Sequence, residues 1–253
     1  MLDTHCHLDD ARYDAIIDEV EARRIASGVR VLVPGVGRKS WTALRRRAAE
    51  NGWLYAIGTH PQHLKDATDP VPSEAIGAVA IGECGLHRPS EVPMQHQTAV
   101  LLGHLELAQS LDLPVILHCV RAHDVLPTIL RAFCGSSKLR GVLHSYSGGP
   151  QMVSVYESFG LHLSFGGAIT WPNARRPIEA LRRVSLQHLL LESDGPDQAP
   201  RFTPTVWRYG SEPAMMPALF AHAAGLRNTA VDTFTAAVAR NVAELGWDYC
   251  RPN

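Results

Sequence analysis

Two histidines stand one residue apart near the start of the chain, in the sequence MLDTHCHLDD. The apolar stretch that carries them is short enough to be a β-strand, and alternate residues of a strand project to the same face. His5 and His7 would therefore point together, while Cys6 would point the other way. Two neighbouring imidazoles repel each other when charged, but they can share a metal ion when neutral. The pair alone fits a metal site or an ordinary pair of surface or core histidines, so the rest of the chain must decide.

Other histidines and carboxylates stand at or near the ends of apolar runs further along the chain. An unpaired polar side chain in such a place is costly, so each must be hydrogen-bonded or must bind a metal. A catalytic zinc ion uses about three protein ligands, whereas two ions that share one carboxylate would use six. The sequence therefore predicts two divalent ions per chain, with zinc, manganese or magnesium as candidates and Glu83 as the shared ligand. The candidate ligands are His5, His7, Glu83, His118, His144 and Asp194.

These residues need a scaffold that gathers strand ends, and the chain alternates short apolar runs with amphipathic ones. Nearly continuous apolar strands are typical of a parallel sheet that is buried on both faces. Eight strand–helix repeats predict a (β/α)8 TIM barrel with an additional C-terminal helix, and chemistry in such barrels lies at the carboxyl ends of the strands. An open doubly wound sheet is the alternative, but no GxGxxG follows the first strand.

The expected strands span 1–7, 29–36, 54–61, 78–86, 114–120, 141–148, 161–170 and 188–194. The expected helices span 10–27, 39–51, 94–112, 122–133, 149–159, 175–184, 213–225 and 229–245. All of them together are expected to form a single domain over residues 1–253.

Composition narrows the classes of function. The formal net charge is -1, which argues against a large basic surface for nucleic acid. The five cysteines are scattered without a CxxC pair, which indicates a reducing compartment rather than a disulfide framework. No apolar run reaches the roughly 18 residues of a membrane helix, and no secretory leader is visible. We expect a cytoplasmic protein with no membrane association and no obligate protein partner.

Six motifs occur together in one order along the chain: DTHCHLD, GTHP, GECGL, LPVILHC, VLHSYSG and LLLESDGP. In order and spacing, this set resembles the TatD family of metal-dependent deoxyribonucleases, which belongs to the amidohydrolase superfamily. The resemblance covers nearly the whole chain. It implies a hydrolase that trims DNA from its 3′ end with a metal-activated water, and hence single-stranded DNA ends as substrate.

The resemblance also implies roles for individual residues. It places one metal ion between His5, His7, Glu83 and Asp194, and the second between Glu83, His118 and His144. By the same resemblance Asp194 is the general base, Glu83 bridges the ions, and His60 lies near the scissile phosphate. The alternative for His60 is a structural role in the turn before Pro61.

The sequence departs from the family pattern at three places. The family usually has an aspartate where His87 stands, an arginine where Val120 stands, and an arginine–asparagine pair where Gly210 and Ser211 stand. His87 would bring a cation or an extra ligand in place of an acid. The candidate substrate contacts that remain are Arg121, Arg201 and Arg208. The metal site is thus expected to be intact, while phosphate recognition is altered.

Three rival functions remain open. One is a metallohydrolase of the same superfamily that cleaves a lactone, amide or cyclic imide, although Lys39, Lys65 and Lys138 do not stand at strand ends to bridge metals as carboxylated lysines. Another is an esterase or deacylase that acts on aminoacyl-tRNA, which the sequence does not separate from a nuclease. The third is a binding module without activity, for which some ligands should have been lost.

Overall fold

The computed structural model describes residues 1–65, 71–72, 75–202 and 210–248. Within these residues, eight parallel strands form one sheet in the order of the sequence, from β1 to β8. Hydrogen bonds between the segments that follow the first and last strands bring the two ends of the sheet together: Asp194 N–H donates to His5 O over 2.9 Å, and His7 N–H to Gly195 O over 2.7 Å. The strands are β1 (Leu2–Asp3), β2 (Arg30–Pro34), β3 (Leu54–Ile57), β4 (Ala80–His87), β5 (Val115–Val120), β6 (Gly141–Leu143), β7 (Leu161–Phe165) and β8 (Leu189–Leu191).

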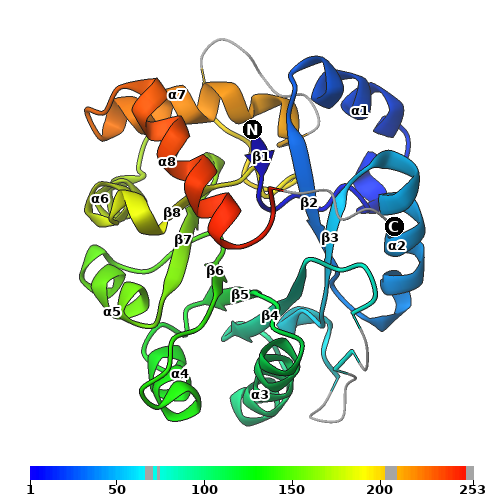
Figure 1. Ribbon diagram of the computed structural model, residues 1–253, viewed down its shortest axis with the longest axis vertical. Helices are drawn as coiled ribbons and strands as arrows, with labels where there is room; N and C mark the ends of the chain where they lie inside the picture. The colour runs from blue at the N-terminus through cyan, green and yellow to red at the C-terminus, as the bar shows by residue number, and fades with distance from the viewer. Residues whose placement is uncertain (66–70, 73–74, 203–209, 249–253) are drawn as a thin grey trace.

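Helices surround the strands as an outer ring, which Figure 1 shows in a view down the barrel. The predicted (β/α)8 TIM barrel is confirmed, and the last helix is additional to the ring. None of the described helices is long and apolar enough to cross a membrane. The helices are α1 (Ile17–Ala26), α2 (Arg38–Asn51), α3 (Met94–Ser110), α4 (Leu126–Cys134), α5 (Val153–Ser158), α6 (Arg175–Arg183), α7 (Met216–Leu226) and α8 (Val231–Glu244).

The additional helix α8 and the residues after it close one end of the barrel, as Figure 1 shows. Trp247 follows this helix and is fully buried, and its indole N–H donates to Val79 O just before β4. Arg30, at the start of β2, donates to the carbonyl oxygens of Trp247 and Asp248. These contacts lie at the amino-terminal ends of the strands. The opposite end of the barrel is therefore left for a functional site.

Several elements are shorter than their sequence patterns predict. The first strand ends at Asp3, so His5 and His7 lie in the segment after it and not within it. The predicted helix from residue 10 begins as a 3-10 turn at Ala11, and α1 begins only at Ile17. The apolar pattern of the sequence shows how far a segment is buried. The hydrogen bonds to neighbouring strands end earlier, because the strands of a barrel are staggered relative to one another.

Glycines allow close approach of the strands around β4. A Cβ atom on Gly85 would overlap the carbonyl oxygen of His118 in β5. A Cβ atom on Gly58 would lie 2.6 Å from the Cα atom of Gly82. Glycine at these positions lets the backbones of β3, β4 and β5 pack together. The side chains that these strands direct into the barrel, including that of Glu83, are therefore held in a fixed position.

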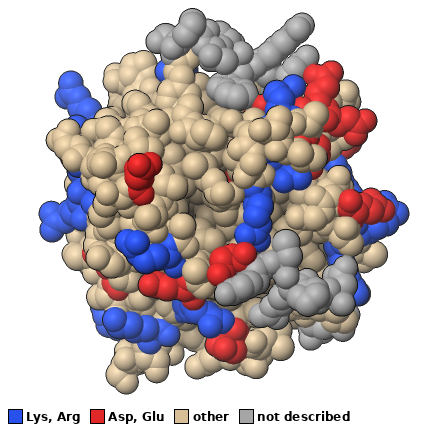
Figure 2. Space-filling model, turned by 45° about the horizontal axis from the view of Figure 1, so that its top comes forward, with Lys and Arg blue, Asp and Glu red and all other residues tan. Residues whose placement is uncertain are grey.

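The surface carries no single-sign field on the face shown in Figure 2. Lys and Arg side chains are interspersed there with Asp and Glu side chains. This arrangement agrees with the formal net charge of -1. The described residues of this face therefore form no broad basic surface along which a long polyanion could bind.

Candidate metal centre

One carboxylate, Glu83 of β4, lies at the centre of the site and is 1% exposed. Its Oε1 atom is 2.7 Å from His118 Nδ1 and 2.7 Å from His144 Nε2. The same oxygen is 3.1 Å from His60 Nε2, and His60 Nδ1 accepts a hydrogen bond from the N–H of Gln62. Three imidazoles thus converge on one oxygen of one carboxylate. His60, which the sequence placed beside the substrate, lies within the group of possible metal ligands.

The second oxygen of Glu83 faces the histidine pair at the start of the chain. Its Oε2 atom lies 3.2 Å from His5 Nε2 and 3.5 Å from His7 Nε2. The two Nε2 atoms are 3.2 Å apart, so both rings point to the same place although they lie outside a strand. The carboxylate of Asp194 completes this side, with Oδ1 at 3.8 Å from His5 Nε2 and 3.9 Å from His7 Nε2.

A buried oxygen of Glu83 that is unpaired among the described residues indicates that these side chains can hold a metal ion. Glu83 Oε2 is buried and receives no hydrogen bond from the described residues, although two imidazole nitrogens lie close to it. A buried carboxylate oxygen without a donor is costly, and a cation held between these donors would remove that cost. Neutral imidazole and carboxylate are ligands that zinc and manganese accept. The His5, His7 and Glu83 group and the His60, Glu83 and His118 group each have the spacing that a metal ion needs.

Electrostatics favour neutral rings at His7 and His118 and an ionised carboxylate at Glu83. His144 differs, because Glu83 and Glu192 outweigh the effect of its burial and raise its pKa well above the usual range. Burial, together with repulsion from His5, lowers the pKa of His7 to about 3. Burial also lowers the pKa of His118 to about 3. Burial alone would raise the pKa of Glu83, but the surrounding imidazoles, His144 first among them, hold that pKa well below its usual range. Metal ligands must be deprotonated, so the directions at His7, His118 and Glu83 suit metal binding near neutral pH, whereas a metal ion at His144 would have to displace a proton.

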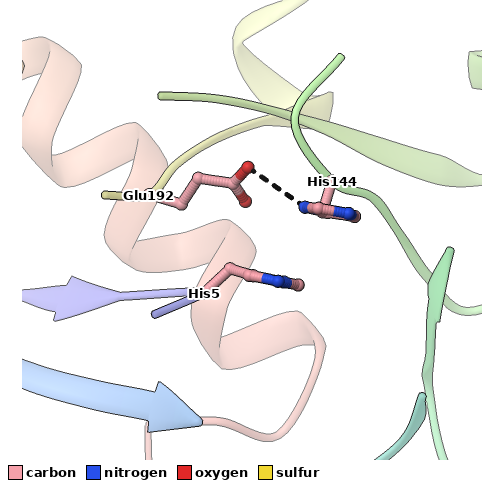
Figure 3. A group of neighbouring side chains, drawn as sticks. All are labelled: His5, His144 and Glu192. Atoms are coloured by element: carbon pink, nitrogen blue, oxygen red, sulfur yellow. Dashed lines mark ion pairs between the residues drawn. The ribbon is translucent and has the colours of Figure 1, made fainter. Parts of the chain in front are cut away.

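A carboxylate that the sequence reasoning missed, Glu192, supports the site from behind His144 (Figure 3). It follows β8 directly and is fully buried. Its Oε1 atom accepts the N–H of Ser145 over 2.6 Å and lies 3.5 Å from His144 Nδ1. The ring of His5 stacks on that of His144, with centroids 3.9 Å apart. Glu192 therefore orients His144 so that its Nε2 atom faces Glu83.

The candidate base, Asp194, lies at the edge of the site, and its side chain is 13% exposed. Its backbone has a left-handed φ of 50° and its N–H is bonded to His5 O, which ties the segment after β8 to the segment after β1. Its Oδ2 atom accepts a hydrogen bond from Gln198 Nε2. Burial raises the pKa of this carboxyl group, while His144 and His5 oppose the rise.

A cavity of about 500 Å³ opens over these residues. On the side nearest the start of the chain its lining is acidic, because Asp9, Asp10 and Asp197 all border it. The one arginine among its described lining residues is Arg12, which donates to both oxygens of Asp10 and to both oxygens of Asp197 at 2.8 to 3.0 Å. This guanidinium is therefore already paired with two carboxylates of the cavity lining. These four bonds use four of its five N–H groups, so a phosphate would compete with the two carboxylates for this guanidinium.

Of the predicted substrate arginines, the two that the structure describes do not line this cavity. Arg121 and Arg201 are exposed and do not line it. Arg208 lies outside the described residues. Ser211, which stands in register with a family asparagine, is buried and its hydroxyl donates to Ser193 O, so it holds the segment after β8. The structure thus offers no described arginine at the mouth other than Arg12.

His87 and two cysteines lie next to candidate ligands in the sequence, and the structure shows what each of them contacts. The Nδ1 atom of His87 is 3.0 Å from His118 Nε2, the ring nitrogen that points away from Glu83. Burial lowers the pKa of His87, which favours a neutral ring over the cation that the sequence suggested. Cys84 and Cys119 pack in the main hydrophobic core, and burial raises the pKa of Cys119 to about 12. A thiolate nucleophile at either position is therefore disfavoured.

Comparison with known proteins identifies the class to which this barrel belongs. Residues 2–245 match the model of the TatD related DNase family. The chain is 33% identical over 261 residues to the 3′-5′ ssDNA/RNA exonuclease TatD of Klebsiella pneumoniae, and the match covers 97% of each chain. It is 32% identical over 209 residues to the uncharacterized metal-dependent hydrolase YabD of Bacillus subtilis, which covers 79% of this chain and 82% of that protein. The crystal structure of the TatD homologue YjjV of Escherichia coli superposes with a TM-score of 0.82 at 28% identity, over 97% of each chain.

The fold and the clustered imidazoles and carboxylates define a metal-dependent hydrolase of phosphodiester or ester bonds. The chain belongs to the TatD family.

Proposed function

We propose that this protein is a two-metal nuclease that removes nucleotides from the 3′ end of single-stranded DNA. The observation that carries the proposal is the position of Glu83, whose two oxygens face separate groups of imidazoles. A carboxylate in this position can bridge two ions about 3.5–4 Å apart. The exonuclease name of the Klebsiella pneumoniae relative supports DNA as the substrate class.

In this proposal His5, His7, Asp194 and Glu83 would hold one ion, and His118, His144 and Glu83 would hold the other. When bound, zinc, manganese or magnesium ions would activate the attacking water and neutralise the charge of the scissile phosphate. Asp194 would accept a proton from the attacking water, because its carboxylate borders both the histidine pair and the cavity. Glu192 holds His144, and His60 bounds the place where the phosphate would lie.

The proposal is tested with purified protein of known metal content and a single-stranded DNA oligomer labelled at its 5′ end. We expect a metal-dependent ladder that shortens from the 3′ end, and none with Asp194→Asn. Asp232→Asn, on the exposed side of α8, makes the same chemical change far from the site and should cleave as the unaltered protein does. Full cleavage by Asp194→Asn, or cleavage that survives a chelator, would refute the mechanism.

The acidic cavity favours a second candidate, an esterase or deacylase that acts on a small molecule or on the aminoacyl end of a tRNA. Asp9, Asp10 and Asp197 would attract the ammonium group next to the ester of an aminoacyl end or of a small molecule. The same protein preparation should therefore be given an aminoacyl-tRNA and a simple aryl ester. Hydrolysis of an ester without cleavage of DNA would favour this candidate over the nuclease.

A further inference from the structure

The two histidines that share one oxygen of Glu83 differ in what lies behind them. His144 turns Nε2 to Glu83 and Nδ1 to the carboxylate of Glu192. His118 turns Nδ1 to Glu83 and Nε2 to the ring of His87. One candidate ligand is therefore supported by a carboxylate and the other by a second imidazole. This asymmetry has a chemical consequence that rests on the proposed metal centre.

The contact fixes the protons of both rings. If His118 Nδ1 offers its lone pair to a cation beside Glu83, its proton must be on Nε2. That N–H then donates to His87 Nδ1 over 3.0 Å, so His87 must carry its own proton on Nε2. The two ring planes are inclined by 26° with centroids 5.2 Å apart, and the contact is made between the edges that carry these nitrogens.

The backbone of His87 is held independently of its ring. Its N–H donates to Gln97 Oε1 over 2.7 Å, and Gln97 Nε2 donates back to His87 O over 3.2 Å. Gln97 lies in α3, is 1% exposed, and also donates to Val92 O. The ladder between β4 and β5 sets His87 opposite Val120 and Gly85 opposite His118. A substitution of the His87 side chain therefore leaves the attachment of β4 to α3 and β5 in place.

We propose that His87 is a positioning residue that holds His118 in the tautomer with Nδ1 toward the metal and sets the affinity of that ion. A hydrogen-bond acceptor behind a histidine ligand raises its basicity, and a carboxylate does so more strongly than a neutral imidazole. With His87 as acceptor, the ion beside His118 and His144 is bound more weakly than a carboxylate at this position would allow.

The experiment is a calorimetric titration of the chelator-treated full chain with zinc, using four variants. His87→Leu removes the acceptor, and we expect the affinity of one site to fall about 10- to 100-fold while the other is unchanged. His87→Asn supplies an amide oxygen near the position of Nδ1 and should restore the affinity to within a few fold. His87→Asp supplies a carboxylate and should bind that ion about tenfold more tightly than the unaltered protein. His96→Leu removes an imidazole of α3 whose ring contacts Gln95 and should titrate as the unaltered protein does.

Proton positions provide a second readout. In zinc-loaded protein with nitrogen-15 histidines, His118 should show a metal-bound Nδ1 and a protonated Nε2, and the Nε2 proton should exchange faster in His87→Leu. Equal zinc affinities in the Leu, Asn and Asp variants would overturn the role of His87, and so would a His118 that binds zinc through Nε2. The proposed function would still stand in either case if two ions were bound. Failure of the unaltered protein to bind a second ion would overturn both.

Discussion

His104 offers a way to test the packing that holds the site. It lies fully buried in α3, where its Nδ1–H donates to Val100 O over 2.8 Å and its Nε2 accepts the N–H of Thr59 over 3.0 Å. Thr59 precedes His60, so this bond ties α3 to the turn that carries a member of the metal cluster. Burial lowers the pKa of His104 from 6.5 to about 4, since a charged ring there would lose its hydration. Protonation would also break the bond from Thr59.

The sign and size of the effect follow from that pKa. The unfolded chain binds the proton at a higher pH than the folded chain, so the free energy of unfolding falls as the pH falls from 6.5 to about 4. Between about pH 7 and about pH 5, the loss from this one group is about 2 kcal/mol. His104→Gln cannot be protonated and should not show this part of the pH dependence.

The assay is urea unfolding of the unaltered protein and of His104→Gln at both pH values. We expect the change in unfolding free energy between about pH 7 and about pH 5 to be about 2 kcal/mol smaller in the variant. His96→Gln, on the same helix, should follow the unaltered protein. If His104→Gln and the unaltered protein lose the same free energy on acidification, His104 is not buried as a neutral ring and the reasoning fails.

Three further outcomes are expected. Glu192→Gln removes the charge behind His144, so zinc affinity by calorimetry should fall about 10- to 100-fold, and an unchanged affinity would contradict that support. Gly58→Ala places a Cβ atom 2.6 Å from the Cα atom of Gly82, so urea unfolding should show a loss of about 1–3 kcal/mol, whereas Gly225→Ala, with nothing within 4 Å, should show none. Hydrolysis should stop on addition of a chelator and return with a divalent metal, and turnover that ignores the chelator would exclude the proposed chemistry.

The sequence predicted the barrel well because parallel strands buried on both faces leave a clear pattern of short apolar runs. It also predicted which side chains meet, since polar residues at the ends of those runs can only converge when the strands close into a barrel. His5 and His7 meet as expected, but the reason differs. The segment after β1 is held by bonds to residues near Asp194, so the ring pair depends on contacts 189 residues away and not on a strand repeat.

What the sequence missed depends on contacts between elements. Glu192 follows the apolar run of β8 just as Asp194 does, and the rule that a buried carboxylate needs a partner could have found it. The predicted pairing of ligands did not reveal that His60 reaches Glu83 Oε1 at 3.1 Å. Whether a nearby arginine faces the site cannot be inferred from strand ends, because loop residues such as Arg121 and Arg201 take their direction from the loop itself.

The measurement that tests the central claim most directly is anomalous X-ray scattering from a crystal of the full chain soaked in zinc. If Glu83 bridges two ions, two peaks about 3.5–4 Å apart should lie on either side of its carboxylate. One should be near His5 and His7, and the other near His118 and His144. A single peak, or two peaks of which neither is within bonding distance of Glu83, would contradict the account.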